Sequence, residues 1–182
     1  RFHDGTPLTT DDVEFTIQKI QDSALKSPRR ADWASVTLKI INSTEIQFIL
    51  KQPYAPFLAN TTIGIIPKHI WKNVDADQFI FSQYNIEPIG SGPYEVSSIK
   101  RDGGGIPQYY ILDTFNRYHN EKPYISEILV YFYPNESAAL EAYNAGIIDN
   151  FAGISPQEAA HIASSSSNST ILHAPRSEER RV

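Results

Sequence analysis

The sequence predicts an α/β fold of the mixed α+β kind, in which helices flank mixed sheets. Two observations lead to this prediction. Helix signals at 9–24 and 135–163 enclose strand patterns at 35–51 and 92–134, and the two kinds of segment do not alternate strictly. With 182 residues, 41% of them hydrophobic and 20% charged, the chain is long enough for one good-sized core or two small ones.

The first predicted helix begins after a turn at residues 4–7. Thr9 suits the N-cap and Asp12 the third helical position, a variant of the capping box. Pro28 ends whatever remains of this helix. Four apolar residues at helical spacing are expected to form its buried face: Val13, Ile17, Ile20 and Ala24.

Two strands are predicted next, at 35–41 and 45–51, and the polar residues 42–44 suit a hairpin turn between them. In the second strand apolar residues alternate with polar ones, as expected for a half-buried strand. A proline-rich passage follows. There we expect a short helical turn, a brief apolar strand at 63–66 and a capped turn at Pro67.

Three further strands are predicted in the second half of the chain. Residues 92–102 and 107–115 are expected to join across the glycines at 103–105, which suit a flexible hairpin tip. Residues 126–134 form an apolar and aromatic run that indicates another strand.

The chain is expected to continue with two capped helices and two short strands. One helix is predicted over 135–146, and a second begins at the N-cap Ser155, with Glu158 at the third helical position. Short strands are predicted at 147–153 and, after a serine-rich loop, at 170–175.

The segment "IGSGPY" at residues 89–94 admits three interpretations. A phosphate-binding loop needs a helix directly after its glycines, whereas the residues after Gly92 alternate as in a strand. A serine nucleophile needs Gly-x-Ser-x-Gly at a strand-to-helix turn, whereas Ser91 lies directly between two glycines. We therefore interpret the segment as a tight turn before a strand.

The ionisable residues form no catalytic or metal-binding motif in the sequence. The chain has no cysteine, and its five histidines form no H-E-x-x-H pattern. Glu158 and His161 are three residues apart on a predicted helix, a spacing more typical of a surface contact. We predict no catalytic residue, no metal site and no cofactor. A hydrolase whose carboxylates or nucleophile meet only in the folded chain is the alternative from another class.

The aromatic content allows two interpretations. Ten tyrosines, nine phenylalanines and two tryptophans make up 12% of the chain, and many of the tyrosines lie in its second half. Packing in the core and the sheets accounts for most of them. A binding cleft with apolar walls and polar tips is the alternative, and periodicity does not separate the two.

Charge and hydropathy exclude two classes of partner. The formal net charge is −5, so the chain has no basic field for nucleic acid, and we predict no nucleic-acid partner. No apolar run approaches the ~20 residues that span a bilayer.

The chain starts at Arg1 without a signal sequence, and we expect a piece of a longer polypeptide whose targeting signal lies upstream.

Several motifs in order resemble one family, the family 5 extracellular solute-binding proteins, which are the peptide and dipeptide receptors of ABC importers. The run "FHDGTPLTTDDVEFTIQKI" is similar to the family's opening landmark, and "LKQPYAPFL" and "IIPKHIW" to the next two. "PIGSGPYEV" resembles its glycine turn, with Ser91 in place of the usual threonine. "NRYHNEKPYISEILVYFYPNESAALEAYNAGIID" resembles a later segment, so that the likeness extends from residue 2 to about 175.

The resemblance implies a fold like that of type II periplasmic binding proteins, in which two lobes close on a ligand. It also implies that the chain is a fragment of such a receptor. Residues 1–87 would belong to an extra subdomain, 88–176 to the first lobe, and 177–182 would lead toward a second lobe that completes the ligand site.

The resemblance also places a ligand-facing loop at Ser27 and Pro28. Larger peptide receptors have an aromatic residue next, whereas this chain has two arginines, followed closely by a tryptophan. A guanidinium suits bidentate recognition of a ligand carboxylate. The predicted ligand-binding residues are therefore Arg29, Arg30 and Trp33, and a solvated loop is the alternative.

The function implied is that of a non-catalytic receptor for an ABC importer, with peptides as the expected ligand. A nickel chelate, an oligosaccharide or another small solute is the alternative within the family. The implied partners are this solute and the permease subunits, and the implied location is the periplasm or the cell exterior. Contact with the membrane would come only through an upstream lipid anchor or the permease.

Overall fold

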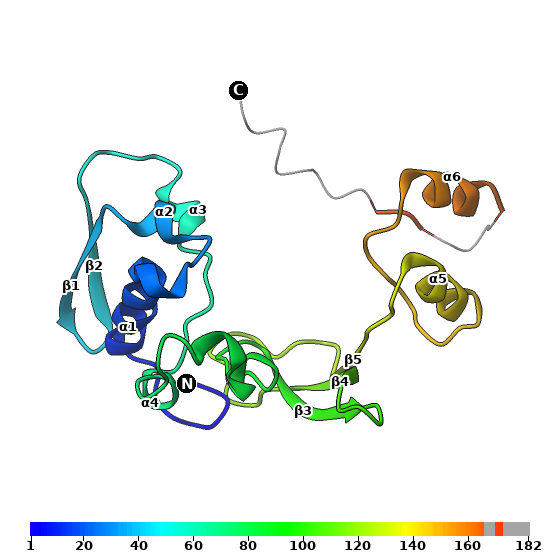
Figure 1. The fold of residues 1–182 in the computed structure, drawn as a ribbon, viewed down its shortest axis with the longest axis horizontal. Coiled ribbons are helices and arrows are strands. Elements are labelled where there is room, and N and C mark those ends of the chain that lie inside the picture. The colour runs from blue at the N-terminus through cyan, green and yellow to red at the C-terminus, as the bar shows by residue number, and fades with distance from the viewer. Residues whose placement is uncertain (166–169, 173–182) are drawn as a thin grey trace. The chain divides into compact units, whose positions relative to one another are not determined.

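The computed structural model describes residues 1–165 and 170–172, and the chain divides into two compact units (Figure 1). Unit 1 comprises Arg1–Val130, and unit 2 begins at Tyr131. No helix among the described residues combines the length and the apolar character that a membrane crossing requires.

The first helix of unit 1, α1 (Thr10–Gln21), starts where the sequence predicts. One carboxylate oxygen of Asp12 accepts hydrogen bonds from the Thr9 backbone N–H at 2.9 Å and from the Thr9 hydroxyl at 3.1 Å. These bonds join the N-cap to the third helical residue, as in a capping box. The acidic side chain also lies at the positive end of the helix dipole.

The buried face of α1 differs from the predicted one. Phe15, Thr16 and Ile17 are buried, whereas Ala24 is exposed, so its predicted burial is wrong. The reason is that α1 ends at Gln21. Ala24 instead lies in the short 3₁₀ helix η1 (Ser23–Leu25), where its N–H donates to the Asp22 carboxylate.

A hairpin packs against α1 (Figure 1). Its strands β1 (Val36–Asn42) and β2 (Glu45–Leu50) confirm the predicted hairpin and pair antiparallel. Their register places Val36 opposite Leu50. The turn is tightened by Asn42, whose side-chain oxygen accepts the Thr44 N–H at 2.9 Å.

The hydrophobic core of unit 1, formed by Ile17, Trp33, Val36 and Phe57, lies between this hairpin and three helices. Besides α1, these helices are α2 (Arg30–Trp33) and α3 (Phe57–Asn60). The Trp33 ring meets the rings of Phe48 and Phe57 edge-on, with centroids 5.9 and 5.5 Å apart. Such aromatic pairs add to the stabilisation from burial alone.

Residues 63–66 do not form the predicted strand, so that prediction is wrong. The Ile66 N–H instead donates to the Thr16 hydroxyl at 3.1 Å, which ties this segment to a helix rather than to a neighbouring strand. The helix α4 (Lys68–Trp71) follows Pro67 directly. Two 3₁₀ helices, η2 (Phe79–Phe81) and η3 (Gln83–Asn85), lead to the glycine segment.

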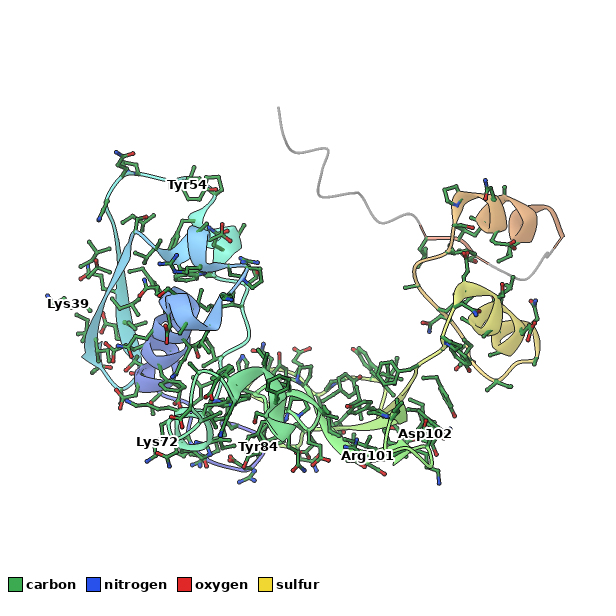
Figure 2. All side chains as sticks on the ribbon, in the orientation of Figure 1. Lys39, Tyr54, Lys72, Tyr84, Arg101 and Asp102 are labelled. Carbon is green, nitrogen blue, oxygen red and sulfur yellow. The ribbon has the colours of Figure 1, made fainter. Side chains whose placement is uncertain are left out.

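A second sheet has the strand order β3-β4-β5. It contains β3 (Tyr94–Arg101), β4 (Pro107–Thr114) and β5 (Glu127–Tyr131), close to the three predicted strands. β3 and β4 are antiparallel. At their hairpin tip, where Figure 2 labels Arg101 and Asp102, the Asp102 carboxylate accepts the N–H groups of Gly104 and Ile106.

The described part of unit 2 contains α5 (Glu136–Asn144) and α6 (Pro156–Ser165), both predicted. Asn135 caps α5 by accepting the Ala138 N–H at 2.9 Å, and Gly146, with φ of 71°, follows its end. The Ser155 hydroxyl accepts the Glu158 N–H at the start of α6, and the Ser155 N–H donates to the Glu136 carboxylate.

Two predicted strands of unit 2 have different outcomes. Residues 147–153 form bends and irregular structure, so the strand predicted there is wrong. The backbone N–H of Ile147 donates to the Ala142 carbonyl at the end of α5 and not to a neighbouring strand. Of the strand predicted at 170–175, residues 170–172 lie outside any strand and 173–175 lie outside the described residues.

Candidate functional site

The predicted ligand-binding residues Arg29, Arg30 and Trp33 occupy one short segment of unit 1, between η1 and β1. Arg29 is the N-cap of α2, and Trp33 is its last residue. The three side chains differ in exposure, because Arg30 lies on the surface, Arg29 is part-buried and Trp33 is only 1% exposed. The segment therefore combines two arginines that reach the surface with one buried tryptophan.

Arg29 has two internal contacts. Its Nε lies 3.0 Å from a carboxylate oxygen of Asp32, and its terminal nitrogen donates to the Asn60 carbonyl at 3.5 Å. The Asp32 carboxylate is near enough to Nε for an ion pair, but the two groups do not form a hydrogen bond. The buried Nε–H therefore has no acceptor among the described residues. These contacts thus hold Arg29 in place but leave one of its N–H groups without a hydrogen bond.

Arg30 is held by the end of α1. Its Nε donates to the Gln21 carbonyl at 3.0 Å. The Gln21 side chain in turn donates to the carbonyls of Trp33 at 2.7 Å and Val36 at 2.9 Å. One glutamine therefore fixes both the start and the end of α2, and sequence reasoning gave no sign of this role.

Trp33 belongs to the hydrophobic core. Its indole Nε1 is buried and has no hydrogen-bond partner among the described residues. Because the ring is buried, direct contact with a ligand would require the ring to move.

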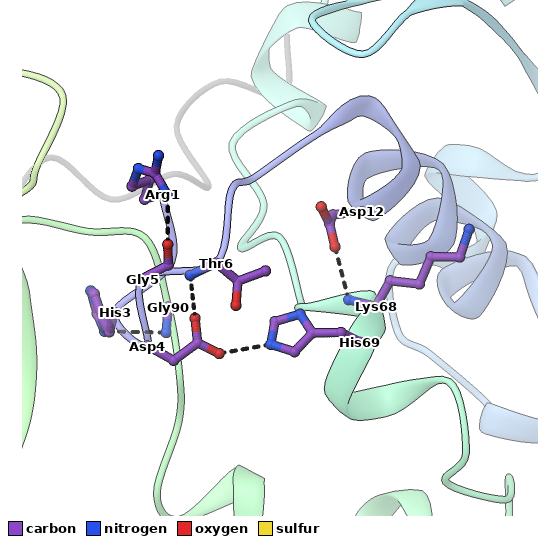
Figure 3. Close-up of polar contacts among 9 residues, drawn as sticks. All are labelled: Arg1, His3, Asp4, Gly5, Thr6, Asp12, Lys68, His69 and Gly90. Atoms are coloured by element: carbon purple, nitrogen blue, oxygen red, sulfur yellow. Dashed lines mark hydrogen bonds and ion pairs between the residues drawn. The ribbon is translucent and has the colours of Figure 1, made fainter.

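A second group of contacts, the polar joint, is formed by His3, Asp4, His69, Gly90 and Gly92 of unit 1. Figure 3 shows the first four of these residues. The His3 N–H donates to the Gly90 carbonyl at 2.8 Å, and the Gly90 N–H donates to the His3 Nδ1 at 3.2 Å. The His3 Nε2 lies 3.2 Å from the Gly92 carbonyl. These bonds select the neutral tautomer that carries its proton on Nε2.

The contacts of the polar joint explain why the segment "IGSGPY" has its glycines. Gly90 comes so close to His3 that a Cβ there would lie 3.3 Å from the imidazole carbon Cε1. The chain bends at residues 92–93 and enters β3 at Tyr94, as expected of a turn before a strand. The segment joins the opening loop to the β3-β4-β5 sheet, and no sequence pattern indicated His3 as its partner.

On the other side of the joint, Asp4 contacts α4. Its carboxylate accepts the Thr6 N–H at 2.9 Å and lies 2.7 Å from the His69 Nε2. Burial raises the pKa of Asp4, but the hydrogen bonds from Thr6 and His69 outweigh it and leave the pKa below its ordinary value. The second oxygen of Asp12 accepts the Lys68 N–H at 2.9 Å, which fastens α4 to α1 as well.

The described residues contain no cluster of three or more histidine, aspartate or glutamate side chains that could hold a metal ion. The side chain of His161, three residues from Glu158, lies outside the described part of the chain. An open surface hollow is lined by His119, Asn120 and Glu121. None of the predicted ligand-binding residues lines it.

The fold and the motifs are those expected of part of a solute-binding protein. The chain belongs to family 5 of the bacterial extracellular solute-binding proteins, because the model "Bacterial extracellular solute-binding proteins, family 5 Middle" matches residues 1–179. The resemblance found from the motifs is thereby confirmed.

Relatives of known structure confirm the mixed α/β fold. The chain is 30% identical over 155 residues to the oligopeptide-binding protein AppA of Bacillus subtilis, covering 83% of this chain and 28% of that protein. The structure of this AppA in complex with a nonapeptide matches with a TM-score of 0.69 and 30% identity, covering 81% of this chain and 29% of that chain. The substrate-binding protein CtaP of Listeria monocytogenes matches with a TM-score of 0.71 and 32% identity, covering 90% of this chain and 33% of CtaP.

A third relative has a different ligand. NikZ of Campylobacter jejuni, solved in complex with Ni(L-His), matches with a TM-score of 0.69 and 26% identity, covering 81% of this chain and 28% of NikZ. Compared with the curated relative AppA, the chain spans about 28% of the length of that protein.

Proposed function

We propose that the chain is part of the substrate-binding component of an ABC importer, which captures a solute outside the cytoplasm and delivers it to the permease subunits. The observation that carries this proposal is the family match over residues 1–179. A receptor of this kind holds its ligand by shape and a few polar contacts, so we infer that it performs no catalysis.

We propose peptides as the ligand. The proposal is supported by 30% identity to AppA, which is named an oligopeptide-binding protein and has been solved with a nonapeptide. Peptides carry a carboxylate at the C-terminus, and two neighbouring arginines are suited to such a group.

A metal chelate is the second candidate ligand, because NikZ matches with a similar TM-score and was solved with Ni(L-His). A chelate of this kind also contains a carboxylate. The same arginines would pair with that carboxylate. The two candidates are therefore distinguished only by identifying the bound ligand.

We also propose the division implied by the family resemblance, with residues 1–87 in an extra subdomain and 88–176 in the first lobe. Residues 177–182 would lead toward the second lobe, and the receptor would work in the periplasm or at the cell exterior. Unit 1 extends across residue 87, and the polar joint connects the two sides through His3 and Gly90. Under this division the polar joint would connect the subdomain to the lobe.

For the ligand site we propose that Arg29 and Arg30 pair with a ligand carboxylate and that Trp33 supports them from the hydrophobic core. The support is that both guanidiniums keep N–H groups beyond those used by Asp32, Asn60 and Gln21. Gln21 holds the loop in place, which lowers the entropy that binding would cost.

Mass spectrometry of small molecules that co-purify with the full-length receptor tests the ligand class. We expect a mixture of short peptides. Recovery of a metal chelate in their place would support the second candidate, and recovery of a sugar would contradict both.

Replacing both arginines tests the site. In the full-length receptor, Arg29→Ala combined with Arg30→Ala is expected to weaken binding of a co-purified peptide by about tenfold or more, since hydrogen bonds to charged groups contribute about 1.5–3 kcal/mol. Calorimetric titration measures this, with Lys72→Ala as a control for the loss of an exposed cation. An unchanged affinity would remove these residues from the site.

A further inference from the structure

Asp32 stands where a ligand carboxylate would bind. It lies three residues after Arg29, and its carboxylate oxygen is 3.0 Å from Arg29 Nε. A carboxylate beside a guanidinium is the same arrangement that a peptide C-terminus or an acidic side chain would form. In the structure the protein itself provides the anion.

This ion pair is easy to replace. Both side chains are about two-fifths exposed, at 42% for Arg29 and 41% for Asp32. Exposed pairs of this kind contribute little to stability. The Arg29 Nε is itself buried and makes no hydrogen bond with Asp32, so the exposed part of this side chain lies elsewhere on it. A ligand carboxylate that approached from the exposed side would therefore compete with an ion pair that lacks a hydrogen bond.

The surroundings of the pair are fixed independently of it. The Gln21 side chain holds the carbonyls of Trp33 and Val36, and the Gln21 carbonyl holds Arg30. Trp33 itself is buried in the hydrophobic core. Movement of the Asp32 carboxylate away from Arg29 would leave these contacts in place, so the exchange of one anion for another needs only a side-chain rotation.

We propose that Asp32 determines specificity by competing with the ligand: it neutralises Arg29 in the free receptor and is displaced when a ligand carboxylate binds there. This inference rests on the proposed function and deepens it. The competition sets a threshold, because a neutral ligand group gains too little from Arg29 to displace Asp32. The site therefore selects ligands with a carboxylate at this position.

The test compares tetra-alanine with its C-terminal amide, because the two differ only in the carboxylate. Calorimetric titration of the full-length receptor gives the ratio of the two affinities. Asp32→Asn, which removes the competing charge, is expected to raise this ratio by about two- to fivefold, the range that exposed ion pairs provide. Arg29→Gln is expected to reduce the ratio toward one.

Asp77→Asn is the matched control, because it removes one exposed aspartate elsewhere in unit 1. It is expected to leave the ratio unchanged. If Asp32→Asn leaves the ratio at the wild-type value, or lowers it, the competition does not exist. If Asp77→Asn raises the ratio equally, the effect comes from net charge and the inference fails.

A second measurement separates this inference from the proposed function. If neither peptide binds the wild-type receptor, the peptide proposal fails, and acetate then serves as the probe. The NMR signal of the Arg29 Nε–H, identified by its loss in Arg29→Lys, is followed as acetate is added. A larger shift in Asp32→Asn than in the wild type supports the competition, and an equal or smaller shift overturns it.

Discussion

The hydrophobic core and the polar joint of unit 1 both connect distant parts of the chain, but by different forces. The core brings together Ile17, Trp33, Val36 and Phe57, which are at most 8% exposed. The joint holds the opening loop to α4 and to the glycine segment by hydrogen bonds, including the contact between the Asp4 carboxylate and His69. The core should therefore respond to changes in volume, and the joint to changes in hydrogen bonding and charge.

The largest effect is expected in the core. Trp33→Ala should lower the free energy of unfolding by about 3–5 kcal/mol, because it removes a large buried ring and leaves a cavity. Trp33→Phe should cost less, since it keeps a ring and also removes the indole N–H that lacks a partner. Urea unfolding measures both. Phe81→Ala is the control, because Phe81 is 82% exposed and should change stability by less than about 0.5 kcal/mol.

A loss of less than about 1 kcal/mol in Trp33→Ala would contradict this picture of the core. It would mean that the ring contributes little despite its burial, and that Trp33 is free to turn toward a ligand. The variant therefore also bears on the supporting role proposed for this residue.

The second effect is expected where the helices α1 and α4 meet. Asp12 is 6% exposed, and its carboxylate accepts three hydrogen bonds, two from Thr9 and one from the Lys68 N–H. Asp12→Ala should cost about 2 kcal/mol, because it removes a helix cap and leaves donors without acceptors.

The neighbouring Asp11 provides a matched control. Its side chain is 63% exposed and lies 3.9 Å from the Lys68 ammonium. Asp11→Ala should cost less than about 1 kcal/mol, as exposed ion pairs do. Equal losses in thermal unfolding of the two variants would show that charge near the helix end, rather than the buried hydrogen bonds, is what matters.

The core and the joint also differ in how far the sequence could predict them. The start of α1 and the hairpin were predictable, because caps, turns and alternation are local signals. The His3–Gly90 contact spans 87 residues and leaves no local pattern. Gln21 is similar, because its partners are backbone carbonyls, which every residue has.

The errors have the same origin. Ala24 fits the helical period but follows the true end of α1, where the Asp22 carboxylate starts a separate 3₁₀ turn. Residues 63–66 have strand composition, but their backbone bonds to a helix side chain, Thr16. At the candidate site, the arginines were identified from family resemblance, whereas Asp32 as their partner required the folded structure.

A smaller effect is expected at His3 in the polar joint. His3→Ala should cost about 1–2 kcal/mol, because it leaves the Gly90 N–H and the Gly92 carbonyl without their side-chain partner. Hydrogen exchange of the Gly90 amide should become about tenfold faster. His119→Ala, at an exposed histidine, should leave this exchange rate unchanged. If the Gly90 amide exchanged at the wild-type rate in His3→Ala, the imidazole would not be what protects it.

The smallest effect is expected at Asp4 and depends on pH. The pKa of Asp4 is below its ordinary value of 3.8: burial raises it, but the hydrogen bonds from Thr6 and His69 lower it by more. A group with a lowered folded-state pKa contributes stability that is fully present above the unfolded-state pKa and is lost as pH falls through the folded-state value. The difference in stability between wild type and Asp4→Asn should therefore shrink as the pH falls below about 4. Urea unfolding of both proteins from pH 7 to pH 2.5 measures this difference. A difference that instead grew on acidification would mean that the Asp4 carboxylate is less stable in the folded chain than in the unfolded one, and that the polar joint is not held by its charge.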